Sequence, residues 1–168
     1  LDYITKNNEF SANGEPASGW EPNKKHNALS TKAKIEKISV ALLKPLTFVN
    51  KTGEVGPPPP PLFKVKPEHI LIIHDDLPLE FGNTKLSFDK NSGGHRGVES
   101  VMKSLKTKKF WRLRIGTANS KLKKAYQMSE KKKNDAIVDF VLSKFSKKEN
   151  EELKSIFELG VEKFLQIK

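Results

Sequence analysis

The chain has 168 residues, enough for one domain with a hydrophobic core of its own. Hydrophobic residues make up 36% of it and charged residues 30%, and it contains no run of about 18 apolar residues, so the composition excludes a membrane-spanning protein. Cysteine is absent, which excludes disulfides, thiolate metal ligands and cysteine nucleophiles. The chain begins with Leu1 and has no apolar signal-peptide region. We expect the protein in the cytoplasm or the mitochondrial matrix, between which the sequence does not decide.

The net charge of +11 is concentrated in one segment. Between Lys103 and Lys133 the chain has twelve Lys or Arg residues and a single acid, Glu130, whereas the rest of the chain is balanced. A charge confined in this way predicts a surface that binds a polyanion such as a nucleic acid. The alternative is a lysine-rich segment that is only solvated.

Strands and helices are expected to alternate along the chain. Residues 7–26, rich in Asn, Gly, Pro, Ser and Lys, are expected to form a loop. Apolar runs and alternating patterns predict strands at 34–45, 69–77, 83–88 and 112–116. The second of these, HILIIHDDL, contains a continuous apolar run that is typical of a central strand buried on both faces.

The spacing of apolar residues also predicts three helices. The first has one apolar stripe, formed by Val98, Val101, Met102 and Leu105. The second covers 134–145, and its residues Ile137, Phe140 and Val141 are expected to face inward. The last begins at a capping box of Ser146 and Glu149. Its apolar face comprises Leu153, Ile156, Phe157, Val161, Phe164 and Leu165. Strands interleaved with helices indicate an α/β fold.

The segment at 56–61 contains five consecutive prolines. Such a run cannot donate backbone hydrogen bonds and adopts the polyproline II conformation. We expect it to be a rigid spacer, and a ligand for an aromatic groove is the alternative.

Polar residues follow the apolar runs of the predicted strands. Asn50, together with Phe48, follows the first strand, Asp75 follows the apolar run of the second, and His95 stands at the start of the first helix. Because sites in α/β proteins form at the carboxyl ends of strands, these residues are candidates to orient a base, bind a carbonyl or hydroxyl group and contact an anion. Each also has a simpler interpretation. Asn50 can be part of a turn, Asp75 can cap a turn, and His95 can start a helix without any chemistry.

The stretch NSGGHRGVES at 91–100 combines open backbone with a guanidinium group. Gly93 and Gly94 leave N–H groups accessible just before a helix N-terminus, which favours an anion. Arg96 adds a fork that fits phosphate. Since the basic segment begins one helix later, the pattern suggests that a nucleic-acid end is held for chemistry. A P-loop, a GxSxG elbow and an HExxH helix are absent from the sequence.

Five segments together resemble one known family: LLKPLTFVNKTGE, ILIIHDDLPLEFGNTKLSF, GGHRGVESVMKSL, FWRLRIG and DFVLSKFSKKE. In order and spacing they are similar to the bacterial-type peptidyl-tRNA hydrolases, from about Leu1 to the C-terminus. The resemblance implies an esterase that uses water, without metal or cofactor, to cleave the ester between a peptide and the terminal ribose of tRNA. It also implies a single domain over residues 1–168, folded as a three-layer α/β/α sandwich with a mixed β-sheet. The expected protein is a monomer that binds peptidyl-tRNA and associates with the ribosome.

The resemblance also implies roles for individual residues. Asp75 matches the aspartate that orients the catalytic histidine, and Asn50 matches the asparagine that holds the substrate and its water. Substrate binding is implied for Phe48 and for His95 of a mobile gate. Arg96 is expected to bind the substrate as well, through its phosphate-fitting fork. The implied tRNA-binding basic patch comprises Lys85, Lys103, Lys108, Lys109, Arg112 and Arg114.

The sequence departs from the family pattern in several places. It is expected to lack the family's first strand and the loop that carries the catalytic histidine, since none of its four histidines matches that position. Arg96 stands in place of an asparagine, and the proline run stands in place of a helix. Two hypotheses are therefore open. One is a peptidyl-tRNA hydrolase that is inactive as this chain, and the other is a non-catalytic RNA- or ribosome-binding protein derived from the same fold.

Overall fold

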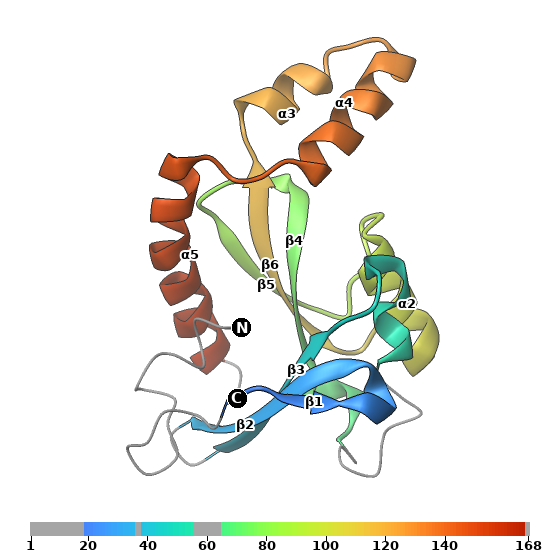
Figure 1. Ribbon diagram of the computed structural model, residues 1–168, viewed down its shortest axis with the longest axis vertical. Helices are drawn as coiled ribbons and strands as arrows, with labels where there is room; N and C mark the ends of the chain where they lie inside the picture. The colour runs from blue at the N-terminus through green and yellow to red at the C-terminus, as the bar shows by residue number, and fades with distance from the viewer. Residues whose placement is uncertain (1–18, 36–37, 56–64, 167–168) are drawn as a thin grey trace. The chain divides into compact units, whose positions relative to one another are not determined.

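The computed structural model describes residues 19–35, 38–55 and 65–166 (Figure 1). The chain divides into two units. Unit 1 comprises Leu1–Ile70 and Phe88–Phe110, and unit 2 comprises Leu71–Ser87 and Trp111–Lys168. The predicted polyproline segment at 56–61 and the first part of the predicted loop, residues 7–18, lie outside the described residues.

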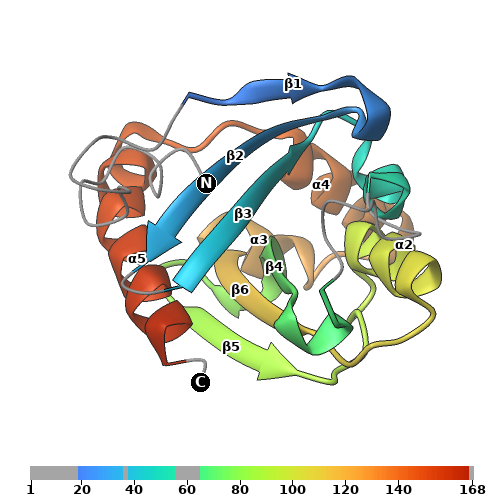
Figure 2. The ribbon, with the colours of Figure 1, turned by 90° about the horizontal axis from the view of Figure 1, so that it is seen from below.

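Unit 1 contains a three-stranded antiparallel sheet in the order β1-β2-β3 (Figure 2). Its strands are β1 (Glu21–Asn23), β2 (Ala28–Ile35) and β3 (Ile38–Pro45), and the 3₁₀ helix η2 (Lys24–His26) lies between the first two. The prediction of a single strand at 34–45 is wrong. The register pairs Ile35 with Ile38, so these residues belong to two antiparallel strands of a hairpin.

The predicted loop is also wrong in its last part, because β1 and η2 lie within it. Of β2, only the last two residues fall within a predicted strand. These errors have one cause. The sequences of β1 and β2, EPN and ALSTKAKI, are mainly polar or small. Their local hydrophobicity is therefore too low to indicate strands. The strands form here by pairing, β2 with β3 and β1 with β2.

The 3₁₀ helix η3 (Val49–Glu54) packs closely against helix α2 (Arg96–Leu105), as Figure 1 shows. The N–H of Gly53 donates a hydrogen bond to Ser100 Oγ over 3.0 Å. A Cβ atom at Gly53 would lie only 2.1 Å from the carbonyl oxygen of Ser100, and one at Gly97 would lie 3.0 Å from Val49 Cγ2. These two glycines let the backbones of η3 and α2 meet. The predicted helix is confirmed, with Val98 and Val101 buried.

Unit 2 contains a second three-stranded sheet, in the order β4-β6-β5. Its strands are β4 (Leu71–Glu80), β5 (Thr84–Phe88) and β6 (Trp111–Ala118), and β4 runs parallel to β6. The predicted strands at 83–88 and 112–116 are confirmed. The strand predicted at 69–77 exists, but it starts after the 3₁₀ helix η5 (Pro67–His69) and continues to Glu80.

Strand β4 differs from the doubly buried central strand that was expected. Within the part of the chain that the structure describes, β4 pairs with β6 alone, and Leu71, Ile72 and Ile73 are half-buried. An apolar run indicates that a strand packs against a hydrophobic core, but it does not indicate how many strands lie beside it. The pairing also continues past the apolar run, with Asp76 opposite Gly116. The HDD motif therefore lies inside the strand and does not follow it.

The pairing of β4 with β6 becomes irregular after Asp76, with a register shift before Glu80. Pro78 lies in this stretch. Proline has no N–H to donate to a neighbouring strand, so it is tolerated where the regular pairing is interrupted. Beyond it, β4 approaches β6 so closely that a Cβ atom at Gly116 would lie 2.0 Å from the carbonyl oxygen of Glu80. The glycine of the RLRIG motif is therefore required by a backbone contact.

Three helices follow β6: α3 (Ser120–Ala125), α4 (Glu130–Leu142) and α5 (Lys147–Leu165). Helix α3 was not predicted, and α4 lies earlier than the predicted 134–145. Val141 and Leu165, which were expected to face inward, are 53% and 49% exposed, because α4 buries none of its residues and Leu165 is the last residue of α5. None of the helices in the described ranges has the length and apolar character that a membrane crossing requires.

Helix α5 is fixed at its start and along its length. The predicted capping box is confirmed, since Ser146 N–H donates to Glu149 Oε2 over 2.7 Å and Glu149 N–H donates to Ser146 Oγ over 3.2 Å. Asn119 Nδ2 also donates to Glu149 Oε1 over 2.7 Å. Farther along, a Cβ atom at Gly160 would lie 3.1 Å from Leu113 Cδ2, so this glycine lets α5 approach β6.

The fold is mixed α/β, as the sequence predicts, with antiparallel strands in unit 1 and a parallel pair in unit 2. The three-layer sandwich and the single domain over residues 1–168 stay predictions.

Gly53→Ala should destabilise the protein by about 1–3 kcal/mol, because the added methyl group must displace the backbone of Ser100. Gly19→Ala is the matched control, since a Cβ atom at Gly19 would meet nothing within 4 Å. Urea denaturation of both variants measures the difference. A midpoint for Gly53→Ala equal to that of the wild type would contradict the packing of η3 on α2.

Glu149→Gln should destabilise the protein at neutral pH. The backbone hydrogen bond from Ser146, followed by the side-chain hydrogen bond from Asn119, holds the pKa of Glu149 below its ordinary value of 4.5. A carboxyl group with a lowered folded-state pKa contributes stability that is complete above the unfolded-state pKa and is lost as the pH falls through the folded-state pKa.

The unfolding free energy of Glu149→Gln should therefore lie about 1 kcal/mol below that of the wild type near neutral pH. This gap should close as the pH falls below 4.5. Urea denaturation over a series of pH values measures it. A gap that does not change with pH would show that the carboxylate charge of Glu149 is not its source.

Candidate functional site

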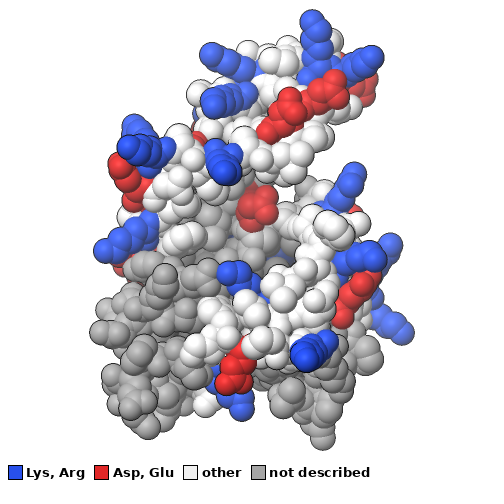
Figure 3. Space-filling model, in the orientation of Figure 1, with Lys and Arg blue, Asp and Glu red and all other residues white. Residues whose placement is uncertain are grey.

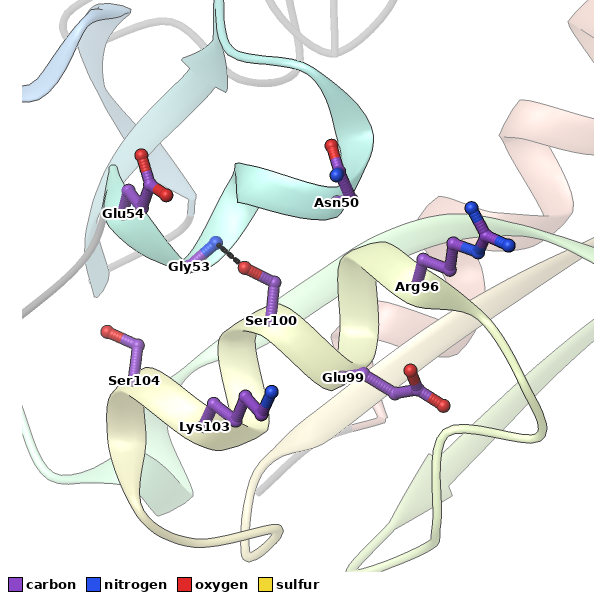
Figure 4. Close-up of a pocket in the computed structure, with 8 residues that line it drawn as sticks. All are labelled: Asn50, Gly53, Glu54, Arg96, Glu99, Ser100, Lys103 and Ser104. Carbon is purple, nitrogen blue, oxygen red and sulfur yellow. Dashed lines mark hydrogen bonds between the residues drawn. The ribbon is translucent and has the colours of Figure 1, made fainter.

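Asn50 and Arg96 line the same open pocket, which lies in unit 1 between η3 and α2 and has a volume of about 650 Å³ (Figure 4). Its lining comprises Asn50, Gly53, Glu54, Arg96, Glu99, Ser100, Lys103 and Ser104. Figure 4 shows Asn50 and Arg96 at one end and Glu54 at the other. With both acidic and basic side chains, the pocket suits a polar or charged group. Across the described residues, no three His, Cys, Asp or Glu side chains gather as a metal site.

The contact between Gly53 and Ser100 positions Asn50. Asn50 lies in the first turn of η3, and the hydrogen bond from Gly53 N–H holds that short helix on α2. Phe48 is the residue before η3, and its side chain is 81% exposed. A large aromatic side chain in solvent beside a polar pocket offers a flat surface on which a base can stack.

His95 is the N-cap residue of α2. Its backbone is extended, and its Nδ1 accepts a hydrogen bond from Val98 N–H over 3.2 Å. The ring therefore satisfies one of the N–H groups that a helix start leaves without an intrahelical partner. His95 therefore starts the helix. Its role in a mobile gate stays a prediction.

The loop before α2 has the open backbone that the sequence predicts. Gly93 and Gly94 have φ angles of 67° and 85°, and a Cβ atom at either would meet nothing within 4 Å. Positive φ rather than crowding therefore favours glycine here. The N–H of Gly94 donates to Ser92 Oγ over 3.1 Å, and Ser92 Oγ donates to Glu99 over 3.1 Å. One N–H group that was expected to face an anion is thus already hydrogen-bonded.

The acids of the HDD motif differ in their surroundings. Asp75 is exposed, whereas Asp76 is buried and accepts a hydrogen bond from Arg114 Nε. Successive side chains of a strand face opposite sides of the sheet, so the two carboxylates point in opposite directions. His74 Nδ1 lies 2.5 Å from the carbonyl oxygen of Asp75. Sequence reasoning selected Asp75 and missed Asp76, although strand alternation indicates that only one of them can face Arg114.

The burial of Arg112 contradicts its predicted place in an exposed basic patch. Arg112 is 3% exposed. Burial, followed by repulsion from Arg114, lowers the pKa of Arg112, and attraction to Asp76 opposes both. A guanidinium group in this position cannot present its fork to a phosphate at the surface. The alternation RLRIG indicated a strand but not which of its faces is covered.

The lysines of the predicted basic patch are exposed, but they belong to different units. Lys103, Lys108 and Lys109 lie in unit 1, and Lys85 lies in unit 2. Lys108 Nζ donates to Asn91 Oδ1 over 3.4 Å, a weak contact that leaves the ammonium group in solvent. Their exposure makes them available to a polyanion.

Two other lysines of the basic segment, which lie on α3 and α4, have local partners. Lys123 Nζ lies 2.5 Å from Glu80 Oε1, and Lys133 Nζ lies 5.4 Å from the centre of the Tyr126 ring. Acidic residues of α4, such as Asp135, also stand among them. Figure 3 shows acidic side chains beside the basic ones in this part of unit 2. The segment is therefore less uniformly positive in space than in sequence.

Comparison with known proteins gives one consistent result. A family profile described as peptidyl-tRNA hydrolase matches residues 2–167. The chain is 35% identical over 134 residues to a peptidyl-tRNA hydrolase of Chlamydia trachomatis, covering 80% of this chain and 70% of that protein. It is 36% identical over 138 residues to one of Chlamydia pneumoniae, covering 82% and 71%.

Solved structures agree with this result. The chain matches a crystal structure of peptidyl-tRNA hydrolase from Acinetobacter baumannii with a TM-score of 0.69 and 25% identity, covering 89% of this chain and 74% of that one. It matches a peptidyl-tRNA hydrolase in complex with N-propanol with a TM-score of 0.66 and 28% identity, covering 82% and 64%. The chain thus spans 64% to 74% of the length of these relatives.

His95→Ala should destabilise the protein by about 1 kcal/mol, because the N-cap acceptor of α2 is lost. His95→Asn is the matched variant, since asparagine is a good N-cap residue and should retain most of the stability. Urea denaturation at neutral pH compares the two. If both variants lose the same amount, the contribution of His95 is not its cap.

Proposed function

Because the chain belongs to the peptidyl-tRNA hydrolase family, we propose that the protein hydrolyses the ester between a peptide and the terminal ribose of tRNA. Water is the nucleophile, and the products are the free peptide and the tRNA. The observation that carries this proposal is the match of the family profile over residues 2–167.

Asn50 and Asp75 are the proposed catalytic residues. Asn50 lines the polar pocket, and its amide can donate to a carbonyl oxygen while accepting a hydrogen bond from a water. Asp75 is exposed on β4, where its carboxylate can orient a histidine base and favour the basic form. Phe48, exposed next to Asn50, contributes a stacking surface for the substrate.

Arg96 and His95 are proposed to bind the substrate from the start of α2. Arg96 stands where the family resemblance places an asparagine. A guanidinium group only donates hydrogen bonds, whereas an amide both donates and accepts. Arg96 therefore suits a phosphate of the tRNA end better than a neutral group. This difference favours the second candidate function, a non-catalytic RNA- or ribosome-binding protein.

The tRNA body is proposed to bind through its phosphates. The proposed contacts are the exposed Lys85, Lys103, Lys108 and Lys109, together with Arg114. Contacts to the backbone carry little sequence information, so different tRNAs should bind about equally.

Hydrolysis also needs a general base, which is typically worth about 10²–10⁴-fold in rate. By resemblance, none of the four histidines of this sequence matches the family's base. A protein without such a base would bind tRNA and hydrolyse peptidyl-tRNA slowly or not at all, which is the second candidate function. A monomer in the cytoplasm or the mitochondrial matrix remains the expected form.

Catalysis is tested by the release of labelled peptide from peptidyl-tRNA by the protein. Asn50→Ala and Asp75→Asn should each lower kcat by about 10²-fold or more. Asp135→Asn removes the charge of an exposed acid on α4 and should leave the rate unchanged. A rate unaffected by Asp75→Asn would remove that residue from the mechanism. Binding of tRNA without hydrolysis would favour the second candidate function.

Replacing Lys103, Lys108 and Lys109 together by glutamine should weaken tRNA binding. The slope of log affinity against log salt should fall by about 0.9 for each lost phosphate contact. A matched control replaces Lys144, Lys147 and Lys154, which are exposed and lie outside the basic segment. Fluorescence anisotropy with labelled tRNA compares the two. An equal loss in both variants would mean that net charge alone determines binding.

A further inference from the structure

Asp76 and Arg114 form an ion pair that the proposed reaction leaves unexplained. In the register, Asp76 of β4 lies opposite Gly116 of β6. Arg114 precedes Gly116 by two residues, so Arg114 and Asp76 are diagonal neighbours on one face of the sheet. Gly116 has no side chain that could stand between them. The carboxylate of Asp76 accepts a hydrogen bond from Arg114 Nε.

This contact leaves the outer fork of Arg114 available. A guanidinium group has one N–H at Nε and four more on its two terminal nitrogens. Asp76 engages Nε, and the terminal nitrogens have no hydrogen-bond partner among the residues that the structure describes. The side chain of Arg114 is 25% exposed, whereas that of Asp76 is 8% exposed. The carboxylate therefore holds the guanidinium group from its buried side, and the fork remains free for a bidentate anion.

Arg112 adds a second positive charge on the same face. It lies two residues before Arg114 on β6, and it is buried. Repulsion from Arg114 is the second cause, after burial, that lowers the pKa of Arg112. An anion bound at the fork of Arg114 would relieve this repulsion. The surroundings thus favour an anion even though Asp76 is present.

We propose that Asp76 is a positioning residue, which holds Arg114 by Nε so that the terminal fork binds one phosphate of the tRNA backbone. This rests on the proposed function, because tRNA is the source of the phosphate. The opposite role for Asp76 would be to neutralise Arg114 and weaken tRNA binding. The two roles predict effects of opposite sign when Asp76 loses its charge.

The test is Asp76→Asn, which raises the net charge by one unit. A stronger positive field alone would tighten the binding of a polyanion. Positioning by Asp76 instead predicts a loss of about tenfold in affinity, the equivalent of one charge-assisted hydrogen bond. Asp135→Asn, at an exposed acid of α4, makes the same change in charge away from the arginines and should not weaken binding. Fluorescence anisotropy of labelled, deacylated tRNA measures all three proteins.

Salt dependence separates positioning from a general loss of structure. The loss of one phosphate contact lowers the slope of log affinity against log salt by about 0.9. A partly unfolded sample binds less but keeps the slope of its folded fraction. Asp76→Asn should therefore have both a lower affinity and a shallower slope than the wild type.

Arg114→Lys keeps the charge but removes Nε and the fork, so it should also lose about tenfold in affinity. If Asp76→Asn does not fold, Arg114→Lys tests whether the fork of Arg114 binds a phosphate. The double variant should bind no more weakly than Arg114→Lys alone. Equal or tighter binding by folded Asp76→Asn, or wild-type affinity in Arg114→Lys, overturns the proposal. If the wild-type chain does not bind tRNA, the proposed function itself is wrong.

Discussion

The contact between the backbones of η3 and α2 is the constraint on which the candidate site of unit 1 depends. Gly53 and Ser100 are 47 residues apart in the sequence, and their hydrogen bond brings the FVN and GGHRG motifs to one pocket. A side chain at Gly53 would push the two helices apart, because its first carbon would overlap the carbonyl oxygen of Ser100. The position of Asn50 beside Arg96 thus depends on the backbone contact at Gly53.

A similar constraint operates in unit 2, where Gly116 allows β4 to approach β6. The pairing is regular up to Asp76 and irregular beyond it. Asp76 therefore occupies the last regular position, from which it reaches Arg114, while Asp75 points to the other face. One strand can then supply two neighbouring acids for two purposes. The buried acid orients a cation, and the exposed acid faces the other side of the sheet, where it has the proposed role beside a histidine.

The elements that were predicted correctly are those whose signals are local. Helix α2 has a clear apolar stripe, and α5 begins at a capping box whose two residues stand three positions apart. Strand β2 could not be predicted, because its polar sequence forms a strand only by pairing with β3. The burial of Arg112 could not be predicted either. Alternation shows that Arg112 and Arg114 share a face, but only the packed structure shows that one is covered and the other reaches solvent. The resemblance located Asn50 and Arg96, yet their common pocket depends on the contact at Gly53, which is not local.

The distribution of charge argues against binding by net charge alone. In the sequence, the segment from Lys103 to Lys133 has only one acid. In the structure, Arg112 is buried, Arg114 contacts Asp76, and Lys123 contacts Glu80. These three cations are buried or paired with a carboxylate. The positive charge available to a polyanion is therefore smaller than the number of Lys and Arg residues in the segment suggests. Binding of a polyanion would then depend on where the remaining cations stand and on how each is oriented. A carboxylate that holds a guanidinium group from one side weakens the long-range attraction of that group for a polyanion. The same contact fixes the orientation of the terminal nitrogens, which then fit a phosphate.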